Sequence, residues 1–259
     1  MASSRRFPPA DLAAHVAREL SGLPGDAPAL IVALSGGRDS VALLDVLLHL
    51  RARTGHVVAA AHVHHGLSTH ADAWAAFCRR LCDRHAITLH VRHVDVGRSH
   101  STSIEAAARQ ARYAALAEIA REAGSGHVVL AHHADDQAET LLLQLVRGAG
   151  PHGLAAMPAS RRRHGVTWWR PLLDVTRDDI DAYIAANDLE HVDDDSNASP
   201  RGRCNAGRLR VVPAMREVAP GYPATLVRAA RLQADAALLA DDIAALDAQQ
   251  AFDGRTLAR

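Results

Sequence analysis

Short apolar runs rich in β-branched residues alternate with helical patterns between residues 29 and 175. Of all features of the sequence, this alternation places the strongest restriction on which folds the chain can adopt. Strands joined by helices pair in parallel, and helices then cover both faces of the sheet. The pattern therefore predicts an α/β fold with a Rossmann-like, doubly wound parallel sheet. The predicted strands are residues 29–34, 57–63, 88–94, 128–131 and 167–169; the predicted helices are 40–53, 72–85, 103–123 and 136–147.

The pattern changes after Leu173. Thr176 is a predicted N-cap for a helix that ends near Asn187, and a polar segment follows at residues 193–203. From Arg208 onward the chain reads as helical, and residues 224–250 form a long amphipathic helix that needs a partner surface. We therefore expect a catalytic domain over residues 1–215. Residues 216–259 are expected to be a helical linker or the start of a C-terminal domain that is absent or truncated.

The composition excludes several classes of protein. The sequence has no lysine, so the Walker-type phosphate loop, which needs one, is excluded. A net charge of zero removes the simplest argument for a nucleic-acid partner, a strongly basic domain. Three cysteines are too few for a disulfide framework, and Cys78 and Cys82 are predicted to pack in the core. No apolar run approaches the roughly 20 residues of a membrane span, so we expect a cytoplasmic protein.

A glycine-containing loop joins the first predicted strand to the first predicted helix. It reads Ser35-Gly36-Gly37-Arg38-Asp39-Ser40. Glycines let a backbone approach an anion closely, and the N–H groups and dipole of a helix N-terminus attract phosphate. A carboxylate in such a loop is unfavourable unless a cation bridges it to the phosphates, so Asp39 predicts bound Mg²⁺.

The loop resembles the SGGxDS signature of the N-type ATP pyrophosphatases, the PP-loop superfamily, which cleave ATP between the α- and β-phosphates. Further motifs resemble those of the tRNA(Ile)-lysidine synthases, over residues 28–215. These motifs are His62-Val63-His64-His65-Gly66-Leu67, Glu105 to Tyr113, His132-His133-Ala134-Asp135-Asp136-Gln137-Ala138-Glu139-Thr140, Arg170-Pro171-Leu172-Leu173, and Asp193-Asp194-Asp195-Ser196-Asn197 with Asn205 and Arg208.

The resemblance implies an enzyme that uses ATP, Mg²⁺, free L-lysine and tRNA(Ile) with a CAU anticodon. ATP adenylates the 2-carbonyl oxygen of the wobble cytosine, and the lysine ε-amine then displaces AMP. Two alternatives stay open: a PP-loop enzyme that thiolates tRNA, and a non-catalytic nucleotide-binding module. A homodimer is also left open, and no membrane partner is expected.

Individual residues receive roles from this resemblance and from their placement. Ser35 to Ser40 and His62 are expected to bind ATP, and Asp39, His132 and Arg112 to act in catalysis. Arg109 and Arg112 share a helical face. Of the two, we favour Arg112 as the functional residue because it adjoins Tyr113. Asp136 and Glu139 lie three residues apart on one helical face, so they can present two carboxylates to the cationic lysine. The residues expected to contact tRNA are Asn197, Asn205 and Arg208.

A run of arginines stands apart from these motifs. Arg161, Arg162 and Arg163 precede His164, and we interpret the run as a loop tip suited to RNA phosphate. A solvated surface explains the same run equally well.

Overall fold

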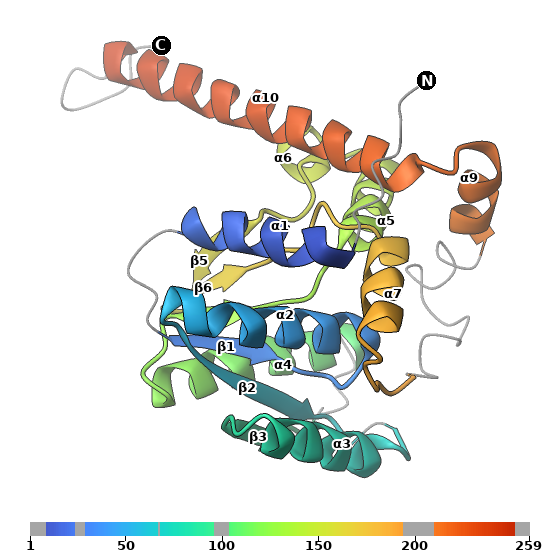
Figure 1. The fold of residues 1–259 in the computed structure, drawn as a ribbon. Coiled ribbons are helices and arrows are strands. Elements are labelled where there is room, and N and C mark those ends of the chain that lie inside the picture. Colours follow the sequence, from blue (N-terminus) through green and yellow to red (C-terminus); the bar gives the residue numbers. More distant parts are fainter. Residues whose placement is uncertain (1–8, 24–28, 67, 96–103, 194–209, 252–259) are drawn as a thin grey trace. The chain divides into compact units, whose positions relative to one another are not determined.

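The computed structural model describes residues 9–23, 29–66, 68–95, 104–193 and 210–251 (Figure 1). The chain divides into two compact units. Unit 1 comprises Met1–His133 and Ala159–Ser199, and unit 2 comprises Ala134–Pro158 and Pro200–Arg259. This division differs from the single domain boundary that we expected at residue 215 from the sequence. The difference arises because the segment after His133 groups with the C-terminal helices.

Unit 1 contains a six-stranded sheet with strand order β3-β2-β1-β4-β6-β5. All neighbouring strands are parallel except β5 and β6. Each of the five predicted strands is present, and the predicted α/β fold is confirmed. The strands are β1 (Ala29–Ala33), β2 (Val57–His64), β3 (Leu89–His93), β4 (His127–Val129), β5 (Ser160–Arg163) and β6 (Val166–Trp169).

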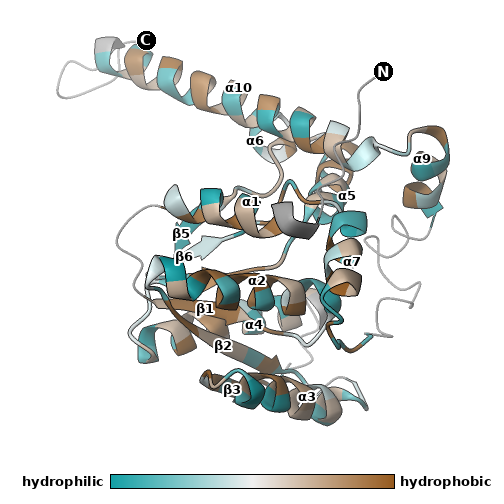
Figure 2. Ribbon diagram, viewed as in Figure 1, coloured by the Kyte–Doolittle hydropathy of each residue, from teal (hydrophilic) through white to brown (hydrophobic). Residues whose placement is uncertain are grey.

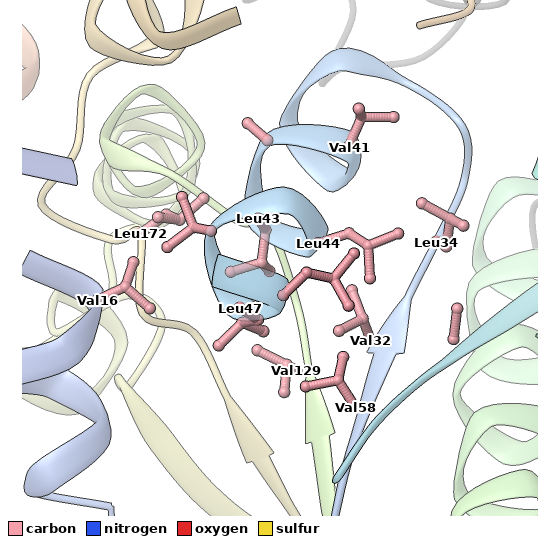
Figure 3. Packing of buried hydrophobic residues seen from close by; sticks show 14 of the residues in the cluster. Val16, Val32, Leu34, Val41, Leu43, Leu44, Leu47, Val58, Val129 and Leu172 are labelled. Carbon is pink, nitrogen blue, oxygen red and sulfur yellow. The ribbon is translucent and has the colours of Figure 1, made fainter. Parts of the chain in front are cut away.

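Helices cover both faces of this sheet. One face packs against α1, α2, α3 and α7, whereas α4 covers the other through Leu116, Ile119 and its alanines. Figure 3 shows side chains of α2 meeting those of β1, β2 and β4, with Val16 of α1 beside them. The helices of unit 1 are α1 (Pro9–Ser21), α2 (Arg38–Thr54), α3 (Ala71–Arg84), α4 (Ile104–Glu122) and α7 (Arg177–Ala186).

The strand order reverses between β1 and β4. The chain moves outward from β1 to β2 and β3, then continues on the other side of β1 with β4 and β6. At such a reversal the connections leave in opposite directions, which opens a crevice at the carboxyl ends of the strands. The segments that follow β1 and β4 contain Ser35 to Ser40 and His132 to His133, so two predicted motifs meet at this edge.

The helix predicted after Thr176 is confirmed as α7. The hydroxyl oxygen of Thr176 accepts a hydrogen bond from the backbone N–H of Asp179, whose carboxylate accepts one from the N–H of Thr176. This reciprocal capping box fixes where α7 begins.

Two elements of unit 1 were not predicted. One is α1, which buries Leu12, Val16 and Leu20. The other is β5, and the interpretation of the arginine run as a loop tip is wrong. Arg161 to Arg163 form an edge strand that pairs antiparallel with β6, and the turn is made by His164 and Gly165, both at positive φ. Both residues adopt the left-handed conformation that tight hairpin turns require.

Unit 2 is helical. It contains α5 (Ala134–Val146), α6 (Pro151–Leu154), α9 (Val212–Val218) and α10 (Tyr222–Ala251). Helix α10 packs on α5 and α6 and buries Val227, Ala230 and Ala237. Apolar and polar bands alternate along α10 in Figure 2, as the predicted amphipathic helix requires. Among the described helices, none is both long and apolar enough to cross a membrane.

A buried hydrogen bond ties α7 to α2 and gives a test of the core. The Tyr183 hydroxyl donates to the Asp45 carboxylate at 2.7 Å, and Asp45 is 7% exposed. Tyr183→Phe removes this hydrogen bond to a charged group and leaves Oδ2 of Asp45 with Nδ1 of His49 at 3.3 Å, so we expect a loss of about 1–3 kcal/mol in the free energy of unfolding, measured by urea denaturation. Tyr113→Phe is the matched control. The Tyr113 hydroxyl makes an exposed 3.3 Å contact with Arg109, so its removal is expected to cost less than about 0.5 kcal/mol. Equal losses in the two variants would contradict this account.

Candidate active site

The loop after β1 is held against α3 by a position that admits no side chain. Gly36 has φ +90°, and a Cβ there would lie 3.0 Å from Val192 Cγ2 and 3.2 Å from Cys78 Sγ. The carbonyl oxygen of Gly36 also accepts a hydrogen bond of 3.0 Å from the backbone N–H of Val192. Only glycine combines this conformation with this approach, so the path of the loop is fixed.

Two serines close the loop on itself. The Ser40 hydroxyl donates to the carbonyl oxygen of Gly37 at 2.8 Å, and the Ser35 hydroxyl accepts from the N–H of Gly37 at 3.2 Å. The two hydroxyls lie 3.1 Å apart. Gly37 is the N-cap of α2, and no side chain caps that end. The first N–H groups of α2 and its dipole therefore suit an anion such as phosphate.

Arg38 is directed to α7. Its guanidinium donates to the Asp181 carboxylate at 2.7 Å, and both side chains are partly exposed. Arg38 was predicted to bind ATP with the rest of the loop, and that role remains a prediction. Asp181 was not singled out from the sequence, because nothing local marks a residue on α7 as the partner of this loop.

Asp39 faces a histidine from the neighbouring strand end. One carboxylate oxygen, Oδ2, lies 3.7 Å from Nε2 of His133, which is 2% exposed. The other oxygen, Oδ1, is buried and has no hydrogen-bond partner among the described residues. A buried carboxylate oxygen without a donor is unfavourable, and a cation would satisfy it. The geometry thus fits Mg²⁺, which binds through one or two carboxylates and completes its shell with water and substrate phosphates.

His62 of β2 contacts the residue that leads into this loop. Nδ1 of His62 lies 2.9 Å from the carbonyl oxygen of Leu34 and 3.5 Å from Cys78 Sγ, and His62 is buried. Burial lowers the pKa of His62, so the ring is neutral at pH 7. Its predicted contact with adenine or ribose remains a prediction.

Arg112 of α4 supplies positive charge on the same side. Burial lowers the pKa of its guanidinium, which nevertheless stays charged at neutral pH. Arg112 lies close enough to His62 and His65 to lower the pKa of each, after the larger effect of burial. Within the described part of the chain, no carboxylate pairs with Arg112. A partly buried cation of this kind fits an anionic ligand.

His132 and the predicted lysine-binding pair follow β4. His132 is partly buried in unit 1, whereas Asp136 and Glu139 lie on α5 of unit 2, both partly exposed. Neighbouring Asp135 is buried, and one of its oxygens lies 3.6 Å from a guanidinium nitrogen of Arg216. Burial, Asp135 and Glu139 raise the pKa of Tyr222 to about 12. Arg216 and Tyr222 were not predicted, since they come from distant helices without a motif.

The residues expected to contact tRNA cannot be placed. Asn197, Asn205 and Arg208 lie outside the described residues. The arginines of β5, by contrast, are described, and all three are exposed on the edge of the sheet.

Two curated relatives of high similarity share a name. The chain is 48% identical over 237 residues to a tRNA(Ile)-lysidine synthase of Chromobacterium violaceum, covering 91% of this chain and 53% of that relative. It is 46% identical over 236 residues to the synthase of Ralstonia nicotianae, covering 90% and 51%. The chain thus spans about half the length of the curated relatives it matches.

A solved structure shares the fold. The U34-tRNA thiolase NcsA from Methanococcus maripaludis, determined with its 4Fe–4S cluster, matches with a TM-score of 0.73 at 16% identity, covering 86% of this chain and 79% of that one. The family described as the PP-loop domain matches residues 12–215, which include both β1 with its serine-glycine loop and the histidine–aspartate segment after β4. The chain therefore belongs to the PP-loop domain family.

Proposed function

We propose that this chain is the catalytic portion of a tRNA(Ile)-lysidine synthase. It would adenylate the wobble cytidine of CAU-anticodon tRNA(Ile) and then couple free L-lysine to that base, releasing pyrophosphate and AMP. The observation that carries the proposal is the Ser35 to Ser40 loop with Asp39 against His133, in a chain whose relatives of that name match about nine-tenths of its length. Both tRNA and ATP point to the cytoplasm as the site of this reaction.

The first half of the reaction would use the loop of unit 1. The cytosine 2-carbonyl oxygen attacks the α-phosphorus of ATP, and the bond to the β-phosphate breaks to release pyrophosphate. The N–H groups at the start of α2 and the guanidinium of Arg112 would stabilise the negative charge that develops on the phosphates. Asp39 would hold Mg²⁺, which neutralises charge on the leaving pyrophosphate.

The second half would use α5. Free lysine is a cation, and its ε-amine must become neutral before it attacks C2 of the adenylated base and displaces AMP. Asp136 and Glu139 would hold the ammonium groups of lysine, and His132 would accept a proton. Asp135 is already paired with Arg216, so it is a weaker candidate for the lysine site.

The thiolation alternative requires reactive cysteines or a cluster. Cys78 and Cys82 are buried, and burial raises their pKa values to about 12 and about 11. Thiols of this kind are poor nucleophiles at neutral pH. In the regions that the structure describes, no three His, Cys, Asp or Glu side chains gather in a metal-binding group. The two described cysteines therefore give no support to sulfur transfer; Cys204 lies outside the described residues.

The reaction itself is the first test. With ATP, Mg²⁺, labelled lysine and CAU-anticodon tRNA(Ile), we expect AMP, pyrophosphate and lysidine in equal amounts, measured by chromatography and by nucleoside analysis of digested RNA. A tRNA with a different wobble base is the control and should give none of them. Formation of ADP would contradict cleavage at the α–β bond, and turnover of ATP without tRNA modification would favour another acceptor.

Asp39 gives the second test. Asp39→Asn removes the charge that would hold Mg²⁺, so we expect adenylation to fall at least about 100-fold, as for loss of other charge-stabilising groups in active sites. Exchange of labelled pyrophosphate into ATP, measured over a magnesium titration, reports this step. Asp83→Asn, an exposed change on α3, is the matched control and should leave the exchange unchanged. A normal magnesium dependence in Asp39→Asn would refute the assignment.

Glu139 gives the third test. Glu139→Gln removes one carboxylate from the proposed lysine site, so about tenfold more lysine should be needed if about 1.4 kcal/mol of charge-assisted binding is lost. Adenylated tRNA is first accumulated without lysine, and lysine is then titrated in. Glu118→Gln on the exposed side of α4 is the control. Equal lysine dependence in both variants, or loss of adenylation in Glu139→Gln, would remove Glu139 from the lysine site.

A further inference from the structure

Three consecutive arginines on the edge strand β5 have no counter-charge of their own. Arg161, Arg162 and Arg163 are all exposed, and none of them makes an ion pair with any described residue. Three other arginines of unit 1 are paired, Arg38 with Asp181, Arg84 with Glu190 and Arg92 with Glu122. In a chain of zero net charge, a strand of adjacent unpaired cations is a local excess that attracts an anionic partner.

The register of the hairpin assigns the arginines to different faces of the sheet. Arg161 lies opposite Trp168 and Arg163 opposite Val166, and residues directly opposite in an antiparallel pair share a face. Trp168 and Val166 belong to the core beneath α4. Arg161 and Arg163 therefore lie on the α4 side, whereas Arg162, opposite Thr167, lies on the other.

Aromatic contacts connect this side of β5 to α4. The ring of Tyr113 lies 4.7 Å from that of Trp168, and the guanidinium of Arg109 lies 5.1 Å above the Tyr113 ring. Arg112 is on the same helix, one turn from Arg109. The α4 side of the sheet therefore carries Arg161 and Arg163 on β5 and Arg109 and Arg112 on α4.

We propose that Arg161, Arg163 and Arg109 form a surface that binds the sugar–phosphate backbone of RNA and leads it toward Arg112. The proposal rests on the proposed function, which supplies tRNA as the substrate. Arg161 and Arg163 are two residues apart on an extended strand, about 6.6 Å, and guanidinium groups bind phosphate oxygens in a bidentate manner. Contacts of this kind to phosphate fix the position of the RNA and carry no sequence information.

The experiment compares two variants from the same strand. The affinity of full-length chain for CAU-anticodon tRNA(Ile) is measured across a series of salt concentrations. Arg161→Ala/Arg163→Ala should reduce the slope of log affinity against log salt by about 1.4–1.8, from roughly 0.7–0.9 for each phosphate contact. Arg162→Ala, on the opposite face, should leave the slope at the parent value. Arg79→Ala/Arg80→Ala on exposed α3 removes the same charge elsewhere and should also leave it unchanged.

The outcomes separate this surface from the proposed function. An unchanged slope in Arg161→Ala/Arg163→Ala would overturn the surface even if the parent makes lysidine, and so would an equal change in Arg162→Ala. If the parent makes no lysidine yet the double variant loses the predicted slope, the RNA surface stands and the proposed function fails.

Arginine on an edge strand also prevents sheets from pairing edge to edge. Aggregation of the double variant in light scattering, with the tRNA slope unchanged, would assign the arginines to that role instead. Arg161→Lys/Arg163→Lys, which keeps both charges, should retain most of the parent slope.

Discussion

Parallel strands place all their carboxyl ends at one edge of a sheet, and in this protein the order of strands reverses there, between β1 and β4. The loop that begins α2 and the segment that ends in His133 emerge side by side because of that reversal. Asp39 and His133 are almost a hundred positions apart in sequence, yet their side chains lie 3.7 Å apart. The candidate site therefore depends on the strand order as much as on the motifs, because that order brings the two motifs to the same edge.

Electrostatics sets the chemistry at that edge. Without lysine, the chain must stabilise phosphate through backbone N–H groups, arginine and a metal ion. The structure contains an N-terminus of α2 that no side chain caps, a partly buried Arg112 without a carboxylate partner among the described residues, and a buried oxygen of Asp39 that suits a cation. Each of the three is unfavourable in isolation and would become favourable with a nucleotide and the proposed Mg²⁺ in place.

The sequence was most informative where local chemistry decides the structure. The five predicted strands, the capping box at Thr176 and the loop around Gly36 follow from patterns within a few residues, and all were predicted at nearly the observed positions. Strand β5 was missed because an edge strand is half solvated, so Arg161 to Arg163 show no apolar alternation. The contacts of Gly36 with Val192 and of Arg38 with Asp181 are tertiary, and no local pattern encodes them. The roles of Asn197, Asn205 and Arg208 stay predictions, because these residues lie outside the described ranges.

Cys78 lies directly beneath Gly36, with its sulfur 3.2 Å from where a Cβ of that residue would be. Its thiol is buried and holds its proton well above neutral pH, so it does not react with alkylating reagents while the loop is seated on α3. Exposure of that sulfur requires the backbone at Gly36 to lift or α3 to detach. The rate at which Cys78 is alkylated would therefore report how often the loop and α3 separate or α3 leaves the sheet, and it would do so without any substrate.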